Sequence, residues 1–325
     1  MRGVCLQKSL FIRGLLLMLL VAGCTPAPVE PIRLGTNVWA GYEPLYLARS
    51  LGWLDEPKIK LVEFMSTTPV LRAMRDHTLE AAAMTLDEAL ILYQDDPDIR
   101  IVLVMDESTG ADVLLARPGI TNLHELKGKR VAAETTALGA YMISRALDRG
   151  QLQLSDITLI SLPANEHAAA FKHGKVDAVI TFEPVKSELL REGAELIFDS
   201  SNIPGEIVDV LVVHDDALAK HRERLVQLLG IWFQATRYLV ENPDDAAKRI
   251  QPRVKLSVSE VLAQYVGLKL PDVDENLTVL GGGEDAKLLG SAHRMADLMM
   301  VRQLIRNHPQ ASLMDASLLR SLEAR

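Results

Sequence analysis

Cysteine is almost absent from this chain. Cys5 and Cys24 are the only two among 325 residues, and both lie in the first 24. The rest of the chain therefore offers no disulfide, no cysteine metal site and no thiol nucleophile.

Positive charge is also scarce. The chain has 35 lysines and arginines against 43 aspartates and glutamates, for a formal charge of −8. Arg2, Lys8 and Arg13 are the only charged residues among 1–23, so removal of that segment lowers the formal charge from −8 to −11. The remaining basic residues are scattered. This excludes nucleic acid as a partner, because phosphate binding needs a basic footprint.

Long hydrophobic runs are missing beyond the N-terminus, and no later stretch reaches the roughly 20 apolar residues that span a bilayer. The N-terminus itself combines basic residues with the apolar runs Leu10–Ile12 and Leu15–Val21 and then small residues. This combination is typical of a secretory signal, which we predict over residues 1–23. Residues 24–31 contain three prolines and are predicted to form an extended tether.

Motifs of catalysis are missing as well. The chain has no Gly-x-Ser-x-Gly elbow, no phosphate loop and no His-Glu-x-x-His pair. Four of its eight histidines, His124, His167, His173 and His221, are predicted on solvent faces of helices. We therefore predict no enzyme activity, no catalytic residue, no metal and no cofactor.

Short apolar runs alternate with helical patterns from residue 32 onward. This alternation predicts an α/β protein with largely parallel sheets. The predicted strands are Ile32–Asn37, Lys60–Phe64, Ala81–Thr85, Arg100–Met105, Asp112–Ala116, Arg130–Ala133, Thr158–Leu162, Ala178–Thr181, Glu195–Phe198 and Asp209–His214. The predicted helices are Pro44–Trp53, Pro69–Asp76, Leu86–Gln94, Leu138–Arg149, Glu166–His173 and Pro184–Arg191. Residues 217–325 carry helical spacing almost throughout.

The strands fall into two groups, which predicts two lobes. We assign residues 32–107 and 215–325 to lobe 1 and residues 108–214 to lobe 2. The first crossing between them is expected near Asp106–Gly110 and the return near His214. Two lobes with two crossings predict a cleft that closes by hinge motion around a ligand.

Several segments resemble a known family. Gly35–Leu54, Leu71–Arg75 with Leu79–Met84, Asn122–Val131 and Ala168–Thr181 are similar to segments of periplasmic substrate-binding proteins of the nitrate, sulfonate and taurine type, a group that also binds thiamine-precursor pyrimidines and riboflavin. The ending Leu20–Cys24 resembles the lipobox of bacterial lipoproteins. The resemblance implies a bilobed periplasmic binding protein fold, delivery of a solute to an ABC importer, and lipidation at Cys24. A related eukaryotic branch is a pyrimidine-synthesising enzyme with a cysteine-rich motif. This chain lacks that motif, so the activity is not carried over.

Candidate ligand-binding residues lie in loops that follow strands, because ligands of α/β sheets sit beyond the carboxyl ends of strands. For each candidate a purely structural role stays open: core packing for the aromatics, helix capping for the hydroxyls and Asn165, and a solvated position for the acids. The candidates are Trp39, Tyr42, Glu43, Ser66, Thr67, Thr68, Thr85, Asp87, Glu134, Thr135, Thr136, Asn165 and Glu183.

The candidate loops contain Glu43, Asp87, Glu134 and Glu183 with no lysine or arginine beside them. Carboxylates with aromatics favour an amine cation or a hydrogen-bonding heterocycle over a bare anion. The backbone at Thr135 and Thr136, at a helix start, is the alternative site for an anion such as a sulfonate or nitrate.

The predicted function is a lipid-anchored solute-binding protein of an ABC importer. Its partners would be a small-molecule solute, a membrane permease and the lipid bilayer. We expect a monomer in the periplasm or on the outer face of the cell membrane. A sensory binding protein that signals to a membrane receptor or cyclase is the first alternative, and an extracytoplasmic enzyme is the second.

Overall fold

The computed structural model describes residues 30–135 and 138–323. The predicted signal, Cys24, most of the predicted tether and Thr136 lie outside these residues. None of the helices within the described stretches has the length and apolar character needed to cross a membrane.

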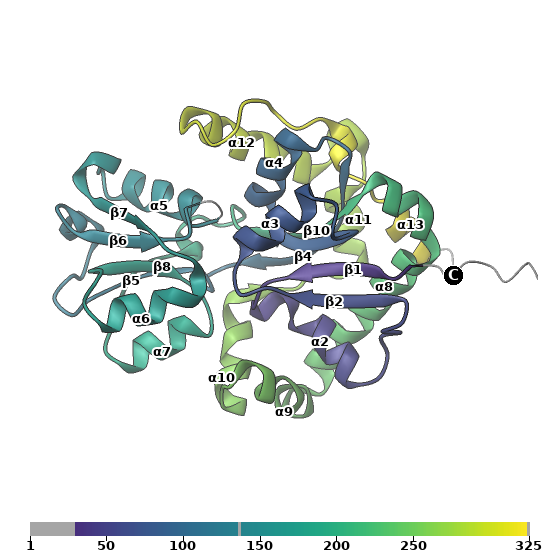
Figure 1. The fold of residues 1–325 in the computed structure, drawn as a ribbon, viewed down its shortest axis with the longest axis horizontal. Helices are drawn as coiled ribbons and strands as arrows, with labels where there is room; N and C mark the ends of the chain where they lie inside the picture. The colour runs from purple at the N-terminus through teal and green to yellow at the C-terminus, as the bar shows by residue number, and fades with distance from the viewer. Residues whose placement is uncertain (1–29, 136–137, 324–325) are drawn as a thin grey trace, which may run out of the picture. The chain divides into compact units, whose positions relative to one another are not determined.

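Eleven strands form two sheets, which we name the first and second sheet (Figure 1). The first sheet has the order β11-β4-β10-β3-β1-β2, and the second has the order β7-β6-β8-β5-β9. The strands of the first sheet are β1 (Ile32–Thr36), β2 (Ile59–Glu63), β3 (Ala81–Thr85), β4 (Ile99–Ser108), β10 (Val208–His214) and β11 (Leu268–Lys269). Those of the second are β5 (Val113–Ala116), β6 (Arg130–Ala133), β7 (Thr158–Ser161), β8 (Ala178–Thr181) and β9 (Glu195–Asp199). All ten predicted strands are confirmed to within three residues at each end.

Helices connect the strands and cover the sheets (Figure 1). The helices that follow the first eight strands are α2 (Glu43–Ser50), α3 (Thr67–Arg75), α4 (Leu86–Asp95), α5 (Leu138–Arg149), α6 (His167–Lys172) and α7 (Val185–Arg191). The C-terminal helices are α8 (Asp215–Glu241), α9 (Pro243–Val254), α10 (Val258–Gln264), α11 (Val273–Leu280), α12 (Lys287–Val301) and α13 (Ser317–Glu323).

The strand order explains which helix covers which face. The chain moves from β1 to β2 in one direction and from β2 across β1 to β3 in the other. Because both crossovers are right-handed, α2 and α3 lie on opposite faces of the first sheet. The same reversal at β6 separates α5 from α6 in the second sheet (Figure 1). Such reversal points are where α/β sheets bind ligands.

The expectation of largely parallel sheets is wrong, because both sheets are mixed. β1 pairs in parallel with β2 and β3, and β6 pairs in parallel with β7 and β8. β10, β4 and β11 are antiparallel to their neighbours, and so is β5 to β8 and β9. The antiparallel pairs arise because the chain passes from β4 straight into β5 and returns into β10 without a crossover helix.

The return to the first sheet lies earlier than predicted. The strand predicted at Asp209–His214 was expected at the end of the second group, but β10 pairs with β3 and β4 in the first sheet. The crossing therefore precedes Val208 and does not lie near His214. Apolar alternation identified the strand, but it carries no information about the sheet in which the strand pairs. The full division into lobes stays a prediction.

The two crossings touch each other. Ser108 Oγ at the end of β4 lies 2.7 Å from Ser200 Oγ, and the backbone N–H of Gly110 donates to Ser200 Oγ at 2.6 Å. The N–H of Asp112 donates to Ser108 Oγ at 3.2 Å. The strand that leaves the first sheet and the segment that leads back to it are thus tied by two short polar contacts, both through Ser200.

The C-terminal helices pack on the first sheet. The predicted apolar face of α8 is confirmed, because Leu225, Leu228, Leu229, Trp232 and Phe233 are all buried. The chain later returns to β4, where Met314 forms a parallel bridge with Ile101. With helices on both faces, β3 is buried over its whole length, as expected for a strand covered on both sides.

Candidate functional site

A small cavity of about 40 Å³ lies at the carboxyl ends of β1 and β3 and of β6 and β8. These are the strands at the reversal points of the two sheets. The cavity is therefore where the strand order predicts a ligand. Its walls are formed by Asn37, Trp39, Tyr42, Thr67, Thr85, Glu88, Asp112, Glu134, Leu138, Gly139, His167, Ile180, Phe182 and Asp209.

Aromatic rings form the apolar part of the wall. Trp39 precedes the short helical turn Ala40–Tyr42, and Phe182 directly follows β8 in the second sheet. Their ring centroids are 5.4 Å apart with the planes at 89°, the edge-to-face packing that aromatic quadrupoles favour. Rings from both sheets thus meet at the cavity.

A pair of aspartates lies on the antiparallel strands β4 and β10. Asp106 and Asp209 are register partners and both are fully buried. The Trp39 indole N–H donates to Asp106 Oδ2 at 3.1 Å, and the Tyr42 hydroxyl donates to Asp209 Oδ1. The two aromatic side chains of the first loop are therefore oriented by the two acids.

Gly41 makes this arrangement possible. A Cβ atom at residue 41 would lie 1.8 Å from Asp106 Oδ2 and 2.5 Å from Trp39 Nε1. No side chain fits at that separation. The close approach of the loop to Asp106 therefore requires glycine at this position.

The cavity wall is acidic, and the charge of Lys186 offsets only part of the effect of burial on the pKa of Asp112. Glu88, Asp112, Glu134 and Asp209 line it, whereas no lysine or arginine of the described residues does so. Asp106 Oδ1, Asp112 Oδ2 and Asp209 Oδ2 are buried and have no hydrogen-bond partner among residues 30–135 and 138–323. Buried polar atoms normally have partners, so the oxygens of Asp112 and Asp209, which line the cavity, are placed to receive a donor from a ligand or from water.

Burial changes the protonation of these acids. It raises the pKa of Asp112 to about 7, with the charge of Asp87 adding to the effect. It raises the pKa of Asp209 well above its ordinary value, and the nearby Asp106 carboxylate raises it further. It also raises the pKa of Glu88 to about 8. Like charges in a buried site resist ionising together, so this group carries protons near neutral pH.

Two glutamates reach the start of other helices. Glu88 accepts from the N–H of Thr85 at 3.0 Å and from the N–H of Leu138, the first residue of α5, at 3.3 Å. Glu134 Oε1 accepts from the Thr68 N–H at 3.0 Å and from the Thr68 hydroxyl, and its Oε2 accepts from the Ala164 N–H at 3.2 Å. Both carboxyl groups therefore join elements of the first and second sheets across the cavity.

His167 lines the cavity from the start of α6. Its Nε2 lies 3.1 Å from the Leu162 carbonyl and its Nδ1 lies 3.3 Å from the Thr181 hydroxyl. The carbonyl needs a donor, so Nε2 carries the hydrogen and Nδ1 accepts from Thr181. Burial lowers the pKa of His167, which keeps the ring neutral.

Comparison with known proteins now places the chain in a family. Residues 25–252, which are most of the chain, match the NMT1-like family. The chain belongs to the NMT1-like family. The resemblance drawn from the sequence is thereby confirmed.

Relatives of this NMT1-like protein are solute-binding proteins by name. It is 25% identical over 228 residues to a putative aliphatic sulfonates-binding protein of Bacillus subtilis, covering 67% of this chain and 68% of the relative. It is 21% identical over 198 residues to the taurine-binding periplasmic protein of Escherichia coli, covering 60% and 62%. The chain thus spans about two thirds of the length of these relatives.

A solved structure supports the fold. The alkanesulfonate-binding protein of Xanthomonas axonopodis pv. citri, bound to MOPS, superposes with a TM-score of 0.74 over 89% of this chain and 97% of its own, at 21% identity. The predicted fold class, a two-lobed periplasmic binding protein with a helical C-terminal region, is confirmed.

Five predicted ligand residues of this NMT1-like protein line the cavity. They are Trp39, Tyr42, Thr67, Thr85 and Glu134. Three others lie close by without being part of the wall. Thr68 binds Glu134, while Ser66 and Asp87 are buried next to residues that line the cavity.

Four predicted residues lie away from the cavity wall. The Thr135 hydroxyl lies 2.6 Å from Ser161 Oγ, and Asn165 is exposed. Glu183 accepts from the Ser187 N–H at 3.1 Å and from its hydroxyl at 3.0 Å, inside the first turn of α7. Glu43 is buried elsewhere. Thr136 falls outside the described residues.

The expectation that Glu43 has no base beside it is wrong. Arg253 Nε lies 3.0 Å from both carboxylate oxygens of Glu43, and Arg253 also pairs with Glu63. Arg253 lies in α9, 210 positions later in the sequence, so the ion pair could not be found from local patterns. The guanidinium also lies 3.6 Å above the ring of Tyr46. Glu43 therefore fixes α9 against α2.

The expectation that His167 and His221 face solvent is also wrong, because both are buried. Sequence reasoning missed further residues of the wall. Asn37 and Phe182 each lie one position past a strand and follow the rule already used. Glu88 is the third residue of α4, where it was open to interpretation as a cap. Asp112 and Asp209 sit at strand starts, where no loop signal marks them.

Proposed function

We propose that this protein is the extracytoplasmic solute-binding protein of an ABC importer. The observation that carries the proposal is the cavity built from the carboxyl ends of both sheets, with contacts from each sheet meeting across it. Membership of the NMT1-like family and the names of the relatives support it. Such a protein would capture its solute between the lobes, close, and dock on the permease.

We further infer that the solute is a small organic cation with a flat apolar part. Four acids line the wall, buried oxygens of Asp112 and Asp209 lack a donor among the described residues, and no lysine or arginine of those residues lines the cavity. A bound cation would draw these acids into their ionised form, whereas a sulfonate or nitrate would find no positively charged side chain on the wall. Trp39, Tyr42 and Phe182 would pack against a ring or an alkylammonium group and contribute cation–π attraction.

Calorimetric titration of the mature chain tests the solute class. The panel contains protonated amines and cationic nitrogen heterocycles, with taurine, an alkanesulfonate and nitrate as the anionic set. We expect tight binding in the cationic set, weakened by about 1–3 kcal/mol in Asp209→Asn, which cannot ionise to pair with the cation. Asp297→Asn, the same change on an exposed side chain of α12, serves as the matched control and should bind normally.

Tight binding of a member of the anionic set, unaffected or improved by Asp209→Asn, would contradict the cationic solute. That result would be compatible with a solute-binding protein, and it would favour the helix start near Thr135 as the site of an anion. Failure of every solute in either set to stabilise the folded chain would count against a binding function.

We also propose that acylation of Cys24 anchors the protein in the membrane. The ending Leu20–Cys24 carries this proposal. Stable anchoring requires more than one acyl chain, since a single chain binds only marginally. Cys24→Ala should abolish labelling by a fatty-acid probe and shift the protein out of the membrane fraction. Unchanged labelling in this variant would place any lipid elsewhere.

A further inference from the structure

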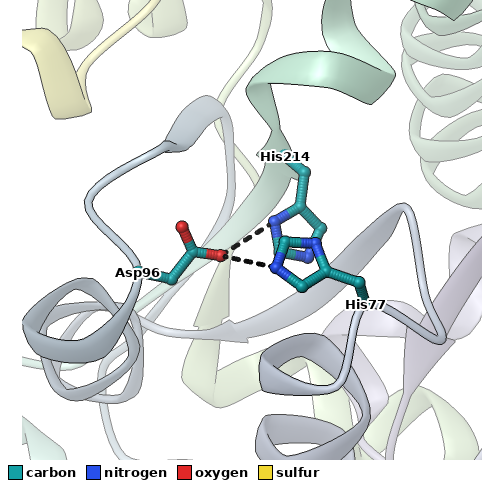
Figure 2. Close-up of side chains that lie close together, drawn as sticks. All are labelled: His77, Asp96 and His214. Carbon is teal, nitrogen blue, oxygen red and sulfur yellow. Dashed lines mark ion pairs between the residues drawn. The ribbon is translucent and has the colours of Figure 1, made fainter.

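Two histidines and an aspartate converge at the edge of the first sheet away from the cavity (Figure 2). His77 follows α3, Asp96 follows α4, and His214 is the last residue of β10. One ligand atom from each side chain lies within 4.8 Å of the others. Three segments that are far apart in the sequence thus bring one carboxylate and two imidazoles together.

The distances fit a single small ion. Asp96 Oδ2 lies 3.1 Å from His214 Nδ1 and 3.7 Å from His77 Nε2. A tetrahedral site with metal–ligand bonds of about 2.0–2.1 Å separates its ligand atoms by about 3.3 Å. Figure 2 shows the two rings stacked on each other, with centroids 4.3 Å apart, and one nitrogen of each facing the same carboxylate oxygen.

The hydrogen bonding of the group is incomplete without a ligand. His214 is only 3% exposed; its Nδ1 faces Asp96 Oδ2 at 3.1 Å and its ring approaches the Met74 backbone, but neither ring nitrogen makes a well-aligned hydrogen bond in the described part of the chain. Asp96 Oδ2 is likewise buried without one. The other oxygen, Oδ1, accepts from the Asp98 N–H at 3.1 Å, which holds the carboxylate with Oδ2 toward the histidines. Metal sites orient their carboxylates in this way.

We propose that His77, Asp96 and His214 bind one divalent transition-metal ion of the Zn²⁺ type. Two imidazole nitrogens and one carboxylate oxygen suit zinc and its neighbours, whereas Mg²⁺ and Ca²⁺ prefer oxygen ligands. His77 is 61% exposed, so the ion enters from solvent and keeps a position for water. The ion ties the ends of α3, α4 and β10 together and stabilises the fold by mass action.

This site is separate from the proposed solute site. Asp209 faces the cavity at the start of β10, and His214, a proposed metal ligand, is the last residue of the same strand. A strand rises roughly 3.3 Å per residue, so the two residues are about 17 Å apart. The protein can therefore bind the metal without binding an organic cation, and it can bind an organic cation without the metal.

The test uses the untagged mature chain, stripped with a chelator and titrated with Zn²⁺. We expect one ion per chain, a higher melting temperature with Zn²⁺, and visible absorption of tetrahedral type with Co²⁺. Excess Mg²⁺ should not compete. His77→Gly and Asp96→Asn should each weaken binding by at least about tenfold.

His77→Gly separates metal binding from folding. His77 has a φ of 50°, in the left-handed region that glycine adopts without strain. The metal-free variant should therefore melt no lower than the metal-free wild type, while its stabilisation by Zn²⁺ disappears. His308→Ala is the matched control, because His308 lies 3.3 Å from Asp297 in an exposed His–Asp pair. It should bind Zn²⁺ normally. Wild-type affinity in His77→Gly or Asp96→Asn, or an equal loss in His308→Ala, would overturn the proposal.

Discussion

The buried acids of the cavity lower the free energy of unfolding by an amount that depends on pH. Asp112 has an ordinary pKa near 3.9 when unfolded, and burial raises its pKa to about 7 in the folded chain. Between these values the folded state binds more protons than the unfolded state. The free energy of unfolding therefore falls as pH rises through this window and levels off above it. Glu88, with a pKa raised by burial to about 8, extends the window upward.

The first prediction is that the ligand-free protein is less stable at pH 8 than at pH 5. Urea titrations at several pH values measure the slope, and Asp209→Asn should reduce it because one raised acid is gone. The same variant should be more stable than wild type at pH 8. A wild-type stability that rises steadily from pH 5 to pH 8 would contradict the ascribed protonation.

The second prediction concerns the solute. A cation binds best to ionised carboxylates, so its affinity should increase between pH 6 and pH 8 and its binding should release protons. Calorimetry in buffers with different ionisation enthalpies measures that release. An anion at the same site would bind more tightly at low pH, and an affinity independent of pH would show that the acids do not touch the ligand.

Residue by residue, the sequence predicted the part of the site that follows parallel strands. Trp39, Tyr42, Thr67, Thr85 and Glu134 were found because each lies within a few positions of a strand's carboxyl end. Asp209 was missed because it lies at the start of a strand, where no loop signal marks it. Its place at the cavity depends on the antiparallel entry of β10 beside β4, and no local pattern reports that pairing.

At the scale of elements, α5 begins at the cavity in close contact with the loop before it. A Cβ atom on Gly139 would lie 2.7 Å from the carbonyl oxygen of Glu134, so this start requires glycine. Glu134 in turn accepts hydrogen bonds from Thr68 at the start of α3 and from Ala164. One carboxylate thus holds the beginning of a first-sheet helix against the second sheet.

The third prediction follows from this contact. Glu134→Gln replaces one accepting oxygen by an amide group that cannot accept, so at least one of the three bonds is lost, at a cost of about 1.5–3 kcal/mol. Hydrogen exchange at the amides of Thr68 and Ala164 should accelerate relative to wild type. Glu166→Gln, on an exposed neighbour, is the control. Unchanged protection at both amides would show that Glu134 does not hold the two elements.

The elements themselves were largely predictable. Apolar periodicity located every predicted strand and helix because each must bury one or both faces. Pairing partners were less accessible, since the direction of β10 and the ion pair of Arg253 with Glu43 depend on chain positions far apart. The family resemblance predicted the fold class, whereas the charge of the cavity could be seen only once the arrangement of the strands was known.

At the scale of the whole molecule, two crossings tied by Ser108 and Ser200 connect the sheets. The fourth prediction is that a tight solute compacts the protein by hinge closure, measured as a smaller radius of gyration in small-angle scattering. Asp209→Asn, which should bind weakly, shows no compaction at the same solute concentration. A bound wild type with the scattering profile of the free protein would contradict closure.

The pairing of β4 with β10 also has a consequence for folding kinetics. The two strands are neighbours in the first sheet, yet residues 109–207 separate them along the chain. Closing a flexible loop of that length costs about 4 kcal/mol of chain entropy. If the second sheet forms first, its two ends already meet where Ser200 contacts Ser108, and the remaining loop is only a few residues long. In that order of events the inserted segment makes the β4–β10 pair of the first sheet a local contact, and folding runs from the middle of the chain outward.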